Sequence, residues 1–196
     1  MHYELGILLK KKVILLGAST GGPSQIKEML SAIKILTCSI VVVQHMQENI
    51  LPFFIKDLQE NLPHRVDSTP VESLFEEPSI IICSSSSILK KTAHKYNMIA
   101  NSAGQIYTPD INKLFKSFVP YINDFEIQII IMTGIGDDGV AGAVELKKLG
   151  AKIIVEHEKS CPVYGMPRVA VEKKIVDEVK TIEELVEYFK ELKWDS

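Results

Sequence analysis

The chain has 196 residues, enough for one domain with its own hydrophobic core. Hydrophobic residues make up 46% and charged residues 24%, with a net charge of −3, as in an ordinary globular protein. There is no basic stripe with interleaved aromatic residues, which argues against nucleic acid as a partner. No apolar run reaches the ~18 residues of a membrane span, and the first lysines follow an apolar patch, the reverse of a secretory signal.

The three cysteines are far apart and odd in number, which fits a reducing cytosol. We therefore expect a cytoplasmic protein without membrane insertion.

Apolar runs alternate with amphipathic stretches along the chain. Strands are expected at 13–16, 39–43, 79–83, 126–132 and 152–156. Helices are expected from Pro23, over 51–62, over 137–150 and from Thr181. Gly150 is expected to end the third of these helices. In the last, Thr181 and Glu184 form a capping-box pattern, and one face carries Ile182, Leu185, Val186 and Phe189. This order predicts an α/β fold, a doubly wound and mostly parallel sheet with helices on both faces. Residues 63–109 are less regular and predict a small antiparallel edge or hairpin. With no repeat or linker in view, we expect a single domain over 1–196.

Polar residues follow several of the predicted strands. Ser19 and Thr20 follow the first strand, His45 the second and Asp138 the fourth. Carboxyl ends of parallel strands meet at one edge of a sheet, where ligands bind. A serine, a histidine and an aspartate at that edge are the side chains needed for nucleophilic acyl transfer.

Each of these residues also has a plainer interpretation. "GASTG" fits the G-x-S-x-G pattern of a nucleophile, but on its own it could also be an ordinary turn or a phosphate cradle. The phosphate fingerprints are incomplete, since Ser19 replaces the second glycine of G-x-G-x-x-G and no Gly-Lys-Ser/Thr ending follows. His45 could simply bond a neighbouring carbonyl, and His157, after the fifth strand, competes with it as the base.

The stretch "TGIGDDG" at 133–139 has several possible uses. Asp138 could be a carboxylate at a helix N-terminus, favoured by the helix dipole. Two adjacent acids make a poor metal cage, so we assign no metal ligand. The amides of Gly134, Ile135 and Gly136 could converge on an oxyanion. Cys161, with no base of its own, is interpreted as a packing residue.

Ordered motifs resemble the CheB family, the catalytic domain of the chemotaxis receptor methylesterases. The matching stretches are "ILLGASTGGP" at 14–23, "VVVQHM" at 41–46, "PDINKLFKSF" at 109–118, "MTGIGDDGVAG" at 132–142 and "SCPVYGMPRVA" at 160–170. The resemblance covers about Val13 to Val179. It implies that Ser19 is the nucleophile, His45 its base and Asp138 the residue that orients the base. It further implies that Thr20 supports the histidine and that the backbone at Ile135, with Gly136, binds the oxyanion; the family usually has methionine at 135.

The resemblance also implies a reaction and a partner. The family hydrolyses glutamate γ-methyl esters on the cytoplasmic helices of methyl-accepting chemotaxis receptors, and many members deamidate glutamines there. No cofactor is implied. About a dozen residues precede the first strand, so we expect no receiver domain and no phosphorylation control in cis.

Some stretches depart from the family pattern. "CSSSSILKK" follows the third strand, Asn112 stands where an aspartate is usual, and His157 stands where an acid is usual. We expect these changes on rim loops, where they would affect substrate docking. Two alternatives therefore stay open, a serine hydrolase of this fold acting on another ester, and a receptor-binding adaptor without activity.

Overall fold

The structure is a computed structural model that describes residues 10–101 and 108–192. Its main sheet has seven strands, and every neighbouring pair in it is parallel. From edge to edge these are β10 (Glu178–Lys180), β9 (Lys152–Glu156), β8 (Phe125–Ile131), β1 (Lys11–Ala18), β2 (Ser39–Gln44), β5 (Ile80–Ile82) and β3 (Val66–Ser68). The chain builds outward from β1 in both directions, which makes the sheet doubly wound.

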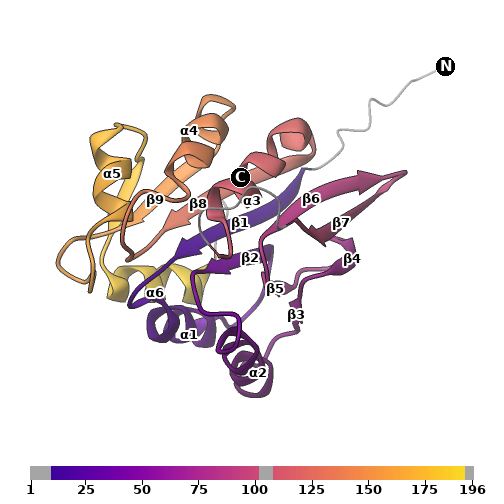
Figure 1. Cartoon of the computed structure of the whole chain (residues 1–196), viewed down its shortest axis with the longest axis horizontal. Helices are drawn as coiled ribbons and strands as arrows, with labels where there is room; N and C mark the ends of the chain where they lie inside the picture. Colours follow the sequence, from indigo (N-terminus) through magenta and orange to yellow (C-terminus); the bar gives the residue numbers. More distant parts are fainter. Residues whose placement is uncertain (1–9, 102–107, 193–196) are drawn as a thin grey trace.

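Helices cover both faces of this sheet (Figure 1). One face carries α1 (Gly22–Ala32), α2 (Leu51–Asn61) and α6 (Ile182–Glu191), and the other carries α3 (Ile111–Ser117), α4 (Val140–Lys148) and α5 (Met166–Glu172). Successive strand residues belong to opposite cores. Val41 and Val43 pack on the α3 side, whereas Ile40 and Val42 pack on the α1 side. The strands are therefore buried on both faces, and the predicted fold class is confirmed.

A smaller antiparallel sheet packs beside α3. Its strands are β4 (Val71–Leu74), β7 (Lys95–Ala100) and β6 (Ser87–Thr92), in that order. Leu89, Tyr96 and Met98 from this sheet belong to the same core as α3. The antiparallel edge predicted in the middle of the chain is thus confirmed, although β3 from the same stretch joins the parallel sheet.

The predicted helix ends agree well with the structure. Thr181 and Glu184 form both bonds of a capping box at the start of α6. After α4, Gly150 has a φ of +99°, and its N–H bonds the Lys147 carbonyl as a helix-ending glycine does. That helix begins at Val140, with Gly139 as its N-cap, rather than at Asp137. The short elements α3, α5, β10 and the 3₁₀ helix η1 (Val119–Asp124) were not predicted.

In the described residues, no helix is long and apolar enough to cross a membrane.

Candidate active site

The register of β1 and β2 places Ser19 beside His45. The strands end in register, with Ala18 opposite Gln44, and the next residue on each strand is Ser19 or His45. The His45 N–H donates to the Ala18 carbonyl at 2.9 Å, which continues the ladder to the end of the strand. On its other side, the Ser19 N–H donates to the Thr133 carbonyl after β8, also at 2.9 Å. Ser19 is therefore fixed through its backbone between the ends of two neighbouring strands.

Asp138 binds the imidazole of His45. The His45 Nε2 lies 2.8 Å from Asp138 Oδ2, and Asp138 is fully buried. The same carboxylate accepts the backbone N–H groups of Ile111, Asn112 and Gly139 at 2.8–2.9 Å. Ile111 and Asn112 open α3, so the carboxylate sits at the N-terminus of that helix. The sequence suggested a carboxylate at the start of α4, and the structure adds α3 as the helix whose amides it binds.

The surroundings of Asp138 favour its ionised form. Burial by itself raises the pKa of this carboxyl group, but the hydrogen bonds from His45, Ile111 and Asn112 outweigh that effect and lower the pKa below the usual value. An ionised carboxylate accepts a proton-bearing Nε2, which assigns the second ring nitrogen of His45, Nδ1, to the side away from Asp138.

Two of the expected contacts around Ser19 are not among the described ones. No hydrogen bond joins Ser19 Oγ to the His45 ring in the part of the chain that the structure describes. The Thr20 side chain is exposed, and its carbonyl, rather than its hydroxyl, is engaged, by Thr133 Oγ1 at 2.8 Å. The geometry thus joins Asp138 to His45 by a side-chain hydrogen bond, and His45 to Ser19 by strand register.

The loop at 134–136 is held tightly against Ser19. A Cβ on Gly134 would lie 2.6 Å from Ser19 Cβ and 2.4 Å from Met166 Sδ, so only glycine fits there. The Gly134 N–H and carbonyl are bonded to the 163–166 segment, whereas the N–H groups of Ile135 and Gly136 form no hydrogen bond with the described residues. Both residues are exposed, and Gly136 has a φ of +82°. Two backbone donors without a partner among the described residues thus directly follow Gly134, the residue that contacts Ser19.

Three buried polar residues around the site were missed from the sequence. Gln44 lies directly before His45, Thr133 lies just after β8, and Glu156 is the last residue of β9; all three are buried. Glu156 Oε2 accepts the Thr133 N–H at 2.9 Å, and Thr133 in turn accepts the Ser19 N–H. The available signal was a polar residue at the end of an otherwise apolar strand, as in "VVVQ" and "KIIVE".

His157 and Cys161 lie in other surroundings. The carboxylate of Asp138 bonds to His45, whereas His157 Nδ1 accepts the Lys159 N–H at 3.0 Å. Burial, followed by the nearby Glu156, raises the pKa of the Cys161 thiol well above its usual value. A thiol with a raised pKa is a poor nucleophile, which favours the packing role for Cys161.

The position of Asn112 corrects one expectation. We expected the change at this residue on a rim loop. Its N–H instead donates to Asp138 Oδ1 at 2.9 Å, and its Oδ1 accepts the Gly142 N–H at 2.8 Å. Asn112 therefore connects the start of α3 to the first turn of α4 directly beside the carboxylate.

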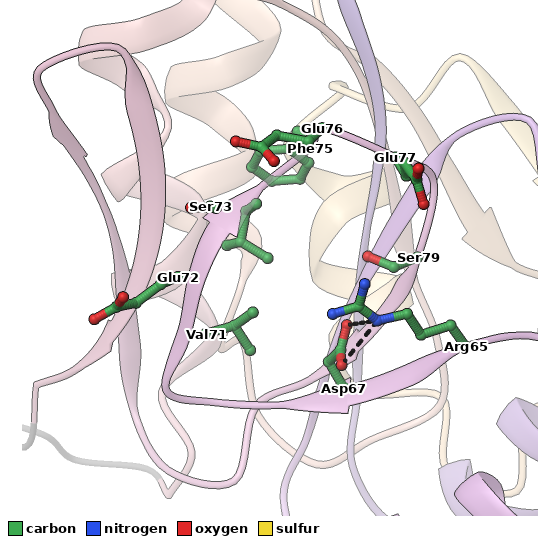
Figure 2. A pocket seen from close by; sticks show the side chains of 10 residues that line it. Arg65, Asp67, Val71, Glu72, Ser73, Phe75, Glu76, Glu77 and Ser79 are labelled. Atoms are coloured by element: carbon green, nitrogen blue, oxygen red, sulfur yellow. Dashed lines mark hydrogen bonds and ion pairs between the residues drawn. The ribbon is translucent and has the colours of Figure 1, made fainter.

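A cavity elsewhere in the chain contains none of these residues. It has a volume of about 380 Å³ and lies along the β3–β4 connection, with Arg65 paired to Asp67 at its edge and Glu72, Glu76 and Glu77 around it (Figure 2). In the described part of the chain, no group of three or more His, Cys, Asp or Glu side chains is placed to hold a metal ion.

Fold and site together define an α/β protein with a serine, a histidine and an aspartate at the carboxyl edge of a doubly wound sheet. The family model for CheB methylesterase matches residues 14–189. The chain therefore belongs to the CheB methylesterase family.

Individual relatives agree with this assignment. The chain is 31% identical to a protein of Methanosarcina barkeri (90% of this chain, 51% of the relative) and 32% identical to one of Bacillus subtilis (89% and 50%), both named protein-glutamate methylesterase/protein-glutamine glutaminase. The chain thus spans about half the length of these relatives. It is also similar to the crystal structure of the Thermotoga maritima CheB methylesterase catalytic domain, with a TM-score of 0.79 and 25% identity over 94% of this chain and 100% of that one.

Proposed function

We propose that this chain is a protein-glutamate methylesterase domain that hydrolyses glutamate γ-methyl esters through a serine acyl-enzyme. The observation that carries the proposal is the arrangement of Ser19, His45 and Asp138, with Ser19 and His45 at adjacent strand ends and a 2.8 Å bond from His45 Nε2 to Asp138. The names of the family and of the relatives supply the ester class. The partners proposed with it are the cytoplasmic helices of methyl-accepting chemotaxis receptors.

Each residue has one task in the reaction. Ser19 Oγ attacks the ester carbonyl carbon while His45 Nδ1 takes the hydroxyl proton. Asp138 holds the imidazole in the required tautomer and stabilises its protonated form. The N–H groups of Ile135 and Gly136 bind the oxyanion, each donor being worth ~3 kcal/mol of barrier.

The tetrahedral intermediate then collapses. The carbon–oxygen bond to the methoxy group breaks, methanol leaves with the proton from His45, and an acyl-enzyme remains on Ser19. Water attacks this ester, again with His45 as base, and releases the glutamate side chain and the free serine. With a glutamine substrate the same steps release ammonia, which is the deamidation that the relatives' names include.

Methanol release from methylated receptor cytoplasmic fragments tests the proposal. Wild type is compared with Ser19→Ala and His45→Ala, which we expect to lose activity by about 10³-fold or more. Matched controls are Ser24→Ala, an exposed serine on α1, and His94→Ala, an exposed histidine in the β6–β7 turn.

The outcomes separate the alternatives. Wild-type turnover that both site variants lose, with both controls active, supports the triad. Equal methanol release by all five proteins refutes the roles of Ser19 and His45. A wild-type chain that binds the receptor fragment without releasing methanol refutes the esterase and favours an adaptor.

A further inference from the structure

Gln44 lies at the end of β2, between the two turns that carry the proposed nucleophile and base. Its side chain is 1% exposed and points to the α1 side of the sheet, because Val43 before it packs on the α3 side. The Gln44 Nε2 donates to the Ser19 carbonyl at 2.8 Å and to the His45 carbonyl at 2.8 Å. One amide group therefore bridges the main chain of both residues.

The direction of this amide is fixed by its partners. Carbonyl oxygens only accept hydrogen bonds, so the NH₂ group must face both of them. The other end, Oε1, is buried and has no hydrogen-bond partner among the described residues. It occupies space beside Gly22, where a Cβ would lie only 2.3 Å from it. Gly22 does not have a positive φ, so its backbone conformation does not require glycine. The position requires glycine because Gln44 Oε1 occupies the space that a Cβ would need.

The unpartnered oxygen is informative. A buried carbonyl without a donor costs stability, and an apolar side chain of similar size would avoid that cost. Packing alone therefore does not account for a glutamine here. What the glutamine supplies is its pair of donors, and both are used on the residues proposed to react.

We propose that Gln44 is a positioning residue that sets the distance and orientation of Ser19 relative to His45. The inference rests on the proposed function. The regular ladder between β1 and β2 ends at the bond from the His45 N–H to the Ala18 carbonyl. Beyond that bond, the two contacts from the Gln44 amide are what ties the Ser19 turn to the His45 turn in the described structure. The Asp138 carboxylate holds the His45 ring, and no hydrogen bond between described residues joins that ring to Ser19 Oγ, so the position of Ser19 relative to the ring depends also on how the two backbones are held.

A serine-directed fluorophosphonate probe tests this role without any receptor substrate. The probe is attacked by an activated Ser19, which forms an oxygen–phosphorus bond and expels fluoride. The variants are Gln44→Met, which keeps the volume without a donor, and Gln44→Glu, which keeps the shape but loses the NH₂ group. Gln128→Met is the matched control. Gln128 is 6% exposed and lies on β8, on the α1 side of the sheet like Gln44. It is bonded to Tyr188 and lies away from the strand ends that carry the site.

We expect the maximal labelling rate of both Gln44 variants to fall about 10- to 100-fold, because a small misalignment of reacting groups has effects of this size. The probe's half-saturating concentration should not change, since Gln44 is buried and does not contact the probe. Gln128→Met should label like wild type. Thermal unfolding of each variant is measured in parallel, and Gln44→Met decides the matter if Gln44→Glu, which buries an acid against two carbonyl oxygens, does not fold.

Wild-type labelling rates in the Gln44 variants, or an equal fall in Gln128→Met, would overturn the positioning role. Methanol release from methylated receptor fragments is measured in the same preparations. If wild type is labelled at Ser19 but releases no methanol, the methylesterase proposal fails while the labelling rates still decide the role of Gln44. A wild-type chain that is not labelled at Ser19 overturns both.

Discussion

Asparagine at position 138 would keep the size of the side chain but could not accept the same hydrogen bonds. Each oxygen of Asp138 accepts two of them, Oδ1 from Asn112 and Gly139 and Oδ2 from Ile111 and His45. An asparagine has one oxygen and one NH₂ group. If its oxygen takes the place of Oδ1, the NH₂ group faces the Ile111 N–H and the His45 ring.

The expected loss of activity follows from the tautomer of His45. An NH₂ group at the place of Oδ2 donates to His45 Nε2, which moves the ring proton to Nδ1. A protonated Nδ1 cannot take the proton of Ser19. The same change in a serine protease triad costs about 10⁴-fold in kcat, equivalent to ~5.5 kcal/mol of barrier. We expect a similar loss for Asp138→Asn, together with ~1–3 kcal/mol of stability because the buried Ile111 N–H loses its acceptor.

The pH dependence of stability gives a second readout. The pKa of Asp138 is lowered in the folded chain, so its stabilising contribution is complete above the unfolded-state pKa of an aspartate and is lost as the pH falls through the lower, folded-state value. Wild type should therefore lose more stability than Asp138→Asn when urea unfolding is repeated at pH values falling below about 4, the unfolded-state pKa of an aspartate.

Methanol release and fluorophosphonate labelling both measure the effect on catalysis. Asp137→Asn is the control, since Asp137 is the adjacent, exposed aspartate. Activity of Asp138→Asn within tenfold of wild type would refute the assignment of Asp138 as the residue that orients His45. A comparable loss in Asp137→Asn would show that the loop, rather than the carboxylate, is responsible.

Three further substitutions separate the site from the scaffold. Gly134→Ala places a methyl group against Ser19 and Met166, so we expect both slower labelling and a loss of about 1–3 kcal/mol in urea unfolding; unchanged labelling would contradict the contact. Thr181→Ala removes the capping box of α6 and should cost ~1 kcal/mol while methanol release stays at the wild-type rate. Cys161→Ser should keep the wild-type rate of methanol release, and a large loss would instead support a thiol nucleophile.

The layout of the fold was predictable because its signals are local. Apolar runs such as "SIVVV" predict strands buried on both faces, the glycine after α4 predicts where that helix ends, and the capping box of α6 predicts where that helix begins. The short helices α3 and α5 have seven residues each, too few to establish a helical period. Their formation depends on tertiary contacts, as the bonds from the start of α3 to Asp138 illustrate.

The residues of the candidate site also fall into those that local sequence signals predict and those that depend on tertiary contacts. Ser19, His45 and Asp138 could be proposed because each follows a predicted strand, and parallel strands bring such positions to one edge. The supporting residues could not be assigned in this way. The amide of Gln44 bonds backbone carbonyls whose positions depend on the register of β1 and β2, and Glu156 reaches Thr133 only because β9 and β8 are neighbours.

The role of the small antiparallel sheet follows from where α3 sits. The sheet shares a core with α3, and the Leu89 N–H on β6 donates to Ser117 Oγ at the other end of that helix. The first amides of α3 donate to the Asp138 carboxylate, which binds His45. A region that looks peripheral in the sequence therefore braces the helix that helps keep Asp138 ionised and in place. Substitutions in this sheet that shift α3 should consequently affect the orientation of His45 as well as stability, because the Asp138 carboxylate is fully buried and water cannot replace a hydrogen bond lost there.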